Sequence, residues 1–112
     1  VDDEKNLRLF YRKELTEEGY QVDLAEDARA AIQSLQAKRP DLIVLDIKMP
    51  GMDGLEALSK ILAKDNSIPV IFNSAFSSYR DSFMSWSANA YLIKSSDLTE
   101  LKAKIRELIG GP

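Results

Sequence analysis

The chain has 112 residues, of which 45% are hydrophobic and 29% are charged, and its formal net charge is −3. This composition is typical of one globular domain and argues against a broad nucleic-acid-binding surface. Because the sequence contains no cysteine and no histidine, disulfides, zinc sites built from these residues and histidine-dependent nucleophilic catalysis are excluded.

The first half of the chain alternates helical and strand patterns. Apolar residues at helical spacing predict a helix over 7–15, with Gly19 as its C-terminal stop. Period-two alternation predicts an edge strand over 20–24. Helical spacing returns over 28–35, and a continuous apolar run over 42–45 predicts a central strand covered on both faces.

The second half continues this alternation after a Pro-Gly loop. Helical spacing over 55–62 is followed by a buried strand over 70–72. The Ser-rich segment 77–86 lacks a clean apolar stripe, and we expect a short, displaced or mobile helix there. A further strand is predicted over 90–93, and an amphipathic helix over 98–108.

Alternating helices and strands with short connections predict an α/β fold with a parallel sheet and right-handed crossovers. No strand pattern precedes the first helix. We therefore expect that the chain begins inside its first strand, at Val1, with a few upstream residues absent. Residues 1–109 are predicted to form one domain and 110–112 a tail or linker. No apolar run approaches the ~20 residues of a membrane-spanning helix.

Polar residues follow the expected strands, and parallel strands bring their carboxyl ends to one edge of a sheet, where ligands bind. These residues are Asp2, Asp3, Asp46, Asn73, Ser74 and Lys94. Two like charges at 4 Å repel by about 4 kcal/mol at an effective dielectric near 20, so we expect a divalent cation and the lysine to neutralise the acids. Oxygen-only ligands favour Mg²⁺ over Zn²⁺. A carboxylate beside Mg²⁺ and a lysine can attack a phosphoryl group and carry it as an acyl phosphate.

Four segments in chain order carry a family resemblance: residues 1–4 (VDDE), 42–54 (LIVLDIKMPGMDG), 70–75 (VIFNSA) and 91–94 (YLIK). Together they resemble the receiver domain of response regulators in two-component signalling, and the match covers essentially the whole chain. The resemblance implies a flavodoxin-like, doubly wound, five-stranded parallel sheet of strand order 2-1-3-4-5 with helices on both faces. We expect the first strand to be truncated in this chain.

The resemblance also implies a phosphoacceptor and a metal site. Asp46 would accept the phosphoryl group. Asp3 and Asp46 would ligate Mg²⁺, Asp2 would act mainly through water, and the backbone carbonyl of Lys48 would complete the site. Such a domain is a signalling phosphoacceptor and catalyses only its own phosphotransfer and dephosphorylation.

Three further roles concern the phosphoryl group and the switch. Ser74 would donate a hydrogen bond to a phosphoryl oxygen, and Lys94 would offset its charge. Ser74 and Tyr91 would form the switch pair, which changes the face made by the fourth helix, fifth strand and fifth helix. The implied partners are a histidine kinase or phosphotransfer protein, an output domain or effector protein, and a second copy in a homodimer. The implied location is cytoplasmic, without direct contact to nucleic acid or membrane.

The sequence departs from the family pattern at two places. Lys94 is usually followed by proline, often through a cis bond, whereas Ser95 follows here. A cis bond without proline costs ~2.5–4 kcal/mol, so we predict a trans bond. Ser87 stands where the family commonly has glycine, which adds to the unusual character of segment 77–86.

Simpler structural roles remain open for the site residues. Asp2 and Asp3 can cap the helix that starts near Glu4. Lys94 can be a solvated charge at a strand end, and Tyr91 can be a core aromatic residue.

Other functions also remain open. A degenerate receiver would bind partners without phosphorylation, which the altered Ser95 and segment 77–86 favour. A phosphatase of the haloacid-dehalogenase type also uses a nucleophilic Asp, but it needs a second acid where this chain has Lys48. A flavin-binding module would need a phosphate-cradling first loop, where this chain has acids.

Overall fold

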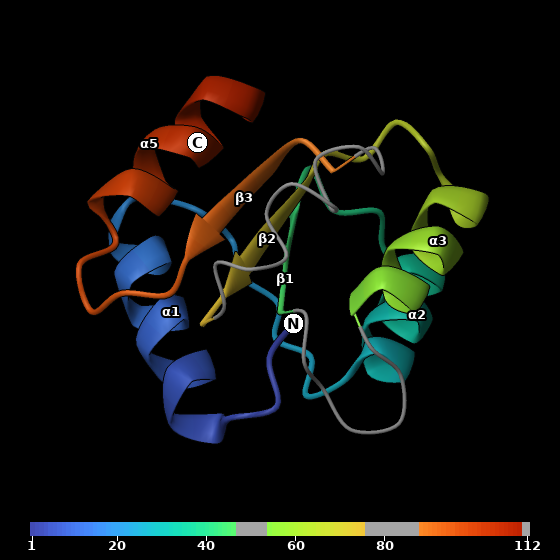
Figure 1. Cartoon of the computed structure of the whole chain (residues 1–112), viewed down its shortest axis with the longest axis horizontal. Coiled ribbons are helices and arrows are strands. Elements are labelled where there is room, and N and C mark those ends of the chain that lie inside the picture. Colours follow the sequence, from blue (N-terminus) through green and yellow to red (C-terminus); the bar gives the residue numbers. More distant parts are fainter. Residues whose placement is uncertain (47–53, 76–87, 111–112) are drawn as a thin grey trace.

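The computed structural model describes residues 1–46, 54–75 and 88–110 (Figure 1). The elements in chain order are α1 (Lys5–Glu17), α2 (Ala28–Ala37), β1 (Ile43–Leu45), α3 (Gly54–Lys64), β2 (Val70–Ser74), β3 (Ala90–Ile93) and α5 (Thr99–Ile109). The predictions for Lys48, for the helix over 77–86, for Ser87 and for the end of the tail fall outside these residues.

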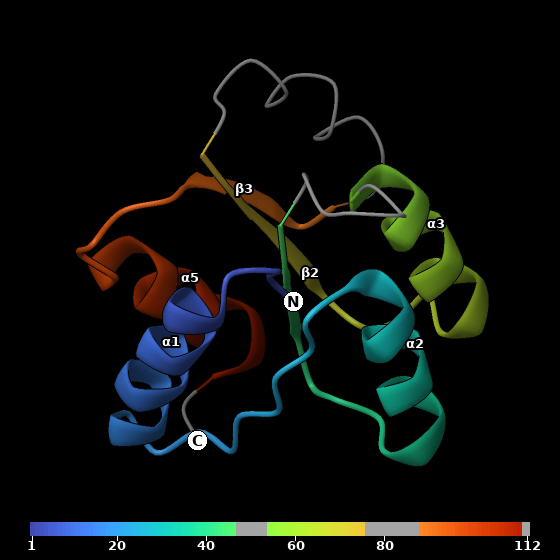
Figure 2. The same ribbon diagram turned by 90° about the horizontal axis from the view of Figure 1, so that it is seen from below.

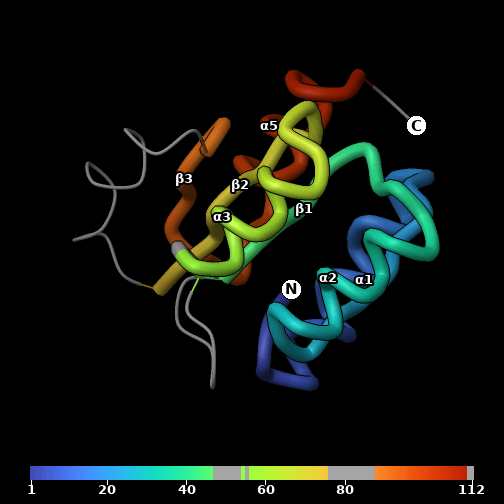
Figure 3. The backbone as a smooth tube through the Cα atoms, turned by 90° about the vertical axis from the view of Figure 1, so that its right-hand side faces the viewer, coloured from blue at the N-terminus to red at the C-terminus, as the bar shows by residue number. Residues whose placement is uncertain are grey.

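The sheet of the described chain has three parallel strands in the order β1-β2-β3. Leu45 lies opposite Phe72, and Phe72 lies opposite Tyr91. Figures 2 and 3 show β2 between its two neighbours. Parallel neighbours joined through helices are what the alternating sequence pattern predicts, and the predicted α/β class is confirmed.

The prediction of an edge strand over 20–24 is wrong, because this segment does not form a regular strand. Its described neighbour, residues 1–2, is likewise not a regular strand. Asp2 donates its N–H to the carbonyl of Ala25 at 3.1 Å, and Asp46 donates its N–H to the carbonyl of Val1 at 3.0 Å. Residues 1–2 therefore lie between the end of this segment and β1, the place that a first strand has in the order 2-1-3-4-5.

Helices cover both faces of the sheet, as predicted (Figure 2). Phe72 belongs to one buried cluster with Leu58 of α3, whereas its neighbour Ile71 belongs to a second cluster with Leu15 of α1 and Leu101 of α5. Successive residues of a strand point to opposite faces, so β2 contributes to both cores. This arrangement leaves the carboxyl ends of the strands as the edge where polar side chains gather.

Gly19 ends α1, as predicted, and a side-chain cap begins α2. Gly19 has a φ of 98° and follows α1, in the left-handed region that favours glycine. The Asp27 side chain accepts the N–H of Ala30 at 2.8 Å and caps α2. None of the described helices has the length and apolar character needed to cross a bilayer.

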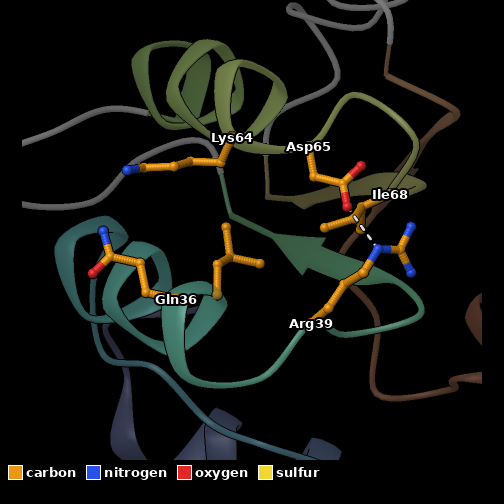
Figure 4. Close-up of a pocket in the computed structure, with 6 residues that line it drawn as sticks. Gln36, Arg39, Lys64, Asp65 and Ile68 are labelled. Carbon is orange, nitrogen blue, oxygen red and sulfur yellow. Dashed lines mark hydrogen bonds and ion pairs between the residues drawn. The ribbon is translucent and has the colours of Figure 1, made fainter.

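A shallow hollow of about 200 Å³ lies between the ends of α2 and α3 (Figure 4). Arg39 Nε lies 2.6 Å from Oδ2 of Asp65, and Ile68 contributes to the same wall. These residues precede β1 and β2 in the chain, so the hollow is at the amino ends of the strands. It lies at the opposite end of the sheet from Asp46.

Candidate functional site

Three acids meet at the carboxyl end of the sheet. Asp2, Asp3 and Asp46 each offer a carboxylate oxygen within 4.8 Å of the others. Asp46 directly follows β1, and its N–H bond to the carbonyl of Val1 brings the two segments together. Asp2 and Asp46 are buried, whereas Asp3 is exposed. The structure therefore brings together the acids that the sequence placed at one edge.

Lys94 joins this acidic cluster from β3. Its Nζ lies 2.7 Å from Oδ2 of Asp2 and 3.4 Å from Oδ2 of Asp46. Its N–H donates to the carbonyl of Ser74 at 2.7 Å, which extends the β2–β3 pairing past the end of β3. The Lys94–Ser95 bond is trans, as predicted.

The charge state of Lys94 follows from its surroundings. Burial by itself lowers the pKa of Lys94, but the hydrogen bond to Asp2 and the charges of Asp46 and Asp2 outweigh burial. The pKa of Lys94 is therefore raised above its ordinary value of 10.5. Lys94 is a cation throughout the neutral range and offsets one of the three negative charges beside it.

Asp2 has both a local structural role and a place in the acidic cluster. Its Oδ1 accepts the N–H of Glu4 at 2.9 Å, just before α1 begins, and its backbone carbonyl accepts a hydrogen bond from Nη1 of Arg8 at 2.8 Å. Glu4 itself makes no side-chain cap. The hydrogen bond from Arg8 to Asp2 was not predicted, because an arginine in an amphipathic helix is normally expected on the solvated face.

Ser74 and Tyr91 lie inside the domain. Ser74 is the last residue of β2 and is fully buried, and Tyr91 in β3 is 5% exposed. The ring centroid of Tyr91 lies 6.2 Å from that of Phe72, at an interplanar angle of 42°. Tyr91 therefore contributes to the core.

A buried polar pair lies next to this site. The side-chain amide of Asn73 donates to the hydroxyl oxygen of Tyr11 at 2.8 Å. Burial raises the pKa of the Tyr11 phenol above its ordinary value of 10.0, so the hydroxyl keeps its proton. The sequence pattern places Tyr11 on the apolar face of a helix and does not predict its hydrogen bond. The one feature of the sequence that points to a buried polar contact is Asn73, a polar residue at the end of a buried strand.

Comparisons with known proteins agree with this geometry. The family model described as the response regulator receiver domain matches residues 1–106. The response regulator MprA of Mycolicibacterium vanbaalenii is 36% identical over 111 residues, which cover 97% of this chain and 48% of that protein. The chain thus spans about half the length of the curated relatives that it matches.

Solved structures show the same fold. The response regulator protein TrrA from Thermotoga maritima, in complex with Mg²⁺–BeF, has a TM-score of 0.91 and 42% identity, and the match covers 96% of this chain and 94% of that chain. TrrA in complex with the histidine kinase ThkA has a TM-score of 0.89 and 41% identity, with 97% and 94% covered. These likenesses confirm the flavodoxin-like α/β fold.

Proposed function

Because the chain belongs to the response regulator receiver domain family, we propose that it accepts a phosphoryl group on Asp46 in a Mg²⁺-dependent reaction. The donor would be the phosphohistidine of a histidine kinase or a phosphotransfer protein. The observation that carries this proposal is the convergence of Asp2, Asp3 and Asp46 beside the ammonium of Lys94. A receiver domain has a signalling role, and we propose that its catalysis is confined to gaining and losing its own phosphoryl group.

The donor set fits a hard divalent cation. It consists of carboxylate oxygens, the ligands that Mg²⁺ prefers, and one lysine offsets only part of their charge. Both carboxylate oxygens of Asp2 are already engaged, one by the N–H of Glu4 and the other by Lys94. Asp3 is exposed, which supports Asp3 and Asp46 as direct ligands and Asp2 as a ligand through water. The carbonyl of Lys48 is proposed to complete the site.

When bound, Mg²⁺ would neutralise negative charge that develops on the phosphoryl oxygens. The chain's own residues perform the transfer. A carboxylate oxygen of Asp46 attacks phosphorus while the bond from phosphorus to the donor's imidazole nitrogen breaks, and the nitrogen keeps the electron pair. Lys94 exchanges a carboxylate oxygen for a phosphoryl oxygen, and the Ser74 hydroxyl donates to another. Water later hydrolyses the acyl phosphate and restores Asp46.

The switch is proposed to connect this site to a partner surface. Movement of Ser74 toward the phosphoryl group would change the space beside Tyr91, which lies one strand away in β3. Segment 77–86, β3 and α5 would then present a different face to an effector, an output domain or a second copy. Relatives about twice as long as this chain support the output domain.

Intact-mass measurement tests the proposed function directly. The protein is incubated with a small phosphodonor and Mg²⁺, and we expect the mass of one added phosphoryl group. Asp46→Asn abolishes the adduct, as does a chelator, whereas Asp41→Asn, at an exposed site before β1, leaves it. No adduct, even with a cognate kinase, would identify a degenerate receiver, and rapid turnover of phosphoesters would identify a phosphatase.

A further inference from the structure

The hydrogen bond between Tyr11 and Asn73 joins two elements that carry different halves of the site. The residues are 62 positions apart, and the amide nitrogen of Asn73 lies 2.8 Å from the phenol oxygen. Tyr11 is 9% exposed and Asn73 is 5% exposed. The bond therefore ties the middle of α1 to the end of β2, inside the core.

The α1 end of this link leads to the acids. Arg8 lies one turn before Tyr11 on α1, and its guanidinium holds the backbone carbonyl of Asp2 at 2.8 Å. The carboxylate of Asp2 also accepts the N–H of Glu4 at the start of the helix. The placement of α1 against the sheet thus bears on the Asp2–Asp3 pair, but backbone hydrogen bonds of Asp2 to Ala25 and of Asp46 to Val1 also hold these acids in place.

The β2 end of the link leads to Ser74. Because neighbouring residues of a strand point to opposite faces, an anchor on the Asn73 side chain sets the rotation of the strand end that carries the Ser74 hydroxyl. The carbonyl of Ser74 in turn accepts the N–H of Lys94 at 2.7 Å. Both phosphoryl-binding residues therefore depend on the strand end that Asn73 holds.

A polar pair at this position has no evident packing advantage. The buried cluster that contains Tyr11 also includes Ile71 and Leu92, and apolar residues of similar shape in place of both partners can be nearly neutral for stability. Buried polar pairs favour one arrangement over others because an unpaired buried amide or hydroxyl is costly. The pair therefore specifies one placement of α1 against β2.

We propose that Tyr11 and Asn73 are positioning residues for phosphotransfer, which hold Ser74 and Lys94 in register with the acids at the start of α1. This inference rests on the proposed phosphoacceptor function. It predicts that loss of the pair changes the rates at which Asp46 gains and loses a phosphoryl group, while binding of Mg²⁺ by the acids stays the same.

The double variant Tyr11→Phe/Asn73→Leu separates positioning from stability. Each single change leaves a polar group without its partner, whereas the double change replaces both by apolar groups and restores stability. We expect the double variant to keep the urea midpoint of the unaltered protein and its Mg²⁺ affinity by calorimetry. Its phosphorylation by a small phosphodonor, followed by intact mass, should slow by roughly threefold to tenfold, the effect of one hydrogen bond of ordinary strength.

A matched control is Tyr20→Phe. The Tyr20 hydroxyl donates to the carbonyl of Gly110 at 3.4 Å on the surface, so this variant loses the same atom and should react at the unaltered rate. A double variant with unaltered stability and unaltered rates would overturn the positioning role. If the double variant does not fold, Tyr11→Phe is compared at a temperature at which it is fully folded, and an unaltered phosphorylation rate would likewise overturn the positioning role. If the unaltered protein takes up no phosphoryl group, the proposed function fails, and this inference fails with it.

Discussion

The ammonium nitrogen of Lys94 lies 2.7 Å from Oδ2 of Asp2. A residue that follows the last described strand thus neutralises an acid that precedes the first helix, although the two are at opposite ends of the chain. The Asp2 side chain is 6% exposed and that of Lys94 is 17% exposed. Because the pair is partly desolvated, removing either partner leaves an unpaired charge in a poorly solvated place, which lowers the stability of the fold.

Lys94→Met removes the cation from beside two buried carboxylates. Without divalent ions we expect the free energy of unfolding to fall by about 2–3 kcal/mol, because both acids lose a partner. Mg²⁺ should recover part of this loss, since the ion supplies the missing positive charge. Urea unfolding with and without Mg²⁺ measures both effects.

Lys102→Met is the matched control for that measurement. Lys102 also contacts two carboxylates, Glu14 at 3.1 Å and Glu18 at 3.4 Å, but these are more exposed. We expect a smaller loss that Mg²⁺ does not change. An equal response of the two variants to Mg²⁺ would contradict the assignment of Lys94 to the metal site.

Asp3→Asn tests the repulsion among the three acids. The change removes one negative charge from a cluster whose ligand atoms lie within 4.8 Å of one another. We expect the free energy of unfolding without Mg²⁺ to rise by about 0.5–1 kcal/mol, because exposure of Asp3 screens part of the repulsion. The stabilisation by added Mg²⁺ should shrink, because the variant binds the ion more weakly.

Thermal unfolding over a range of Mg²⁺ concentrations measures this pair of opposite effects. Asp23→Asn, a change at an exposed position in the 20–24 segment, is the control and should leave the Mg²⁺ dependence unchanged. A Mg²⁺ response of Asp3→Asn equal to that of the unaltered protein would exclude Asp3 as a direct ligand.

Asp65→Asn tests a pH-dependent contribution at the opposite end of the sheet. Hydrogen bonds from Ser67 and Arg39 lower the pKa of Asp65 from 3.8 to about 2. Because the folded protein favours the charged form, the stabilisation is present above pH 3.8 and is lost as the pH falls toward about 2. The difference in urea midpoint between the unaltered protein and the variant should therefore be constant at neutral pH and shrink in this acid range. A difference that grows with acid would contradict the assignment.

Tyr91 variants separate the ring from the hydroxyl. The ring packs 6.2 Å from that of Phe72 in the core, so Tyr91→Ala should lower the free energy of unfolding by about 3–5 kcal/mol. Tyr91→Phe keeps the ring and should change stability by less than about 1.5 kcal/mol. Denaturant unfolding of both variants checks this. Similar losses for the two would place the main contribution in the hydroxyl rather than in packing.

Much of the candidate site could be predicted from the sequence, because most of its residues directly follow predicted strands. A continuous apolar run ends at Asp46, another ends at Asn73 and Ser74, and a third ends at Lys94. Parallel pairing carries all these ends to one edge, so local pattern and topology together predict their convergence. The family motifs added roles that spacing alone does not imply.

The sequence by itself determined the order of helices and strands and the edge at which the polar residues meet, because apolar periodicity and strand ends are local properties of the chain. Only the tertiary structure decided that Lys94 lies nearer to Asp2 than to Asp46, that 20–24 is not a regular strand, and that Tyr11 bonds to Asn73. Each of these depends on how a helix or strand is rotated and shifted against a distant neighbour. That placement is set by packing of the whole core, which no local pattern encodes.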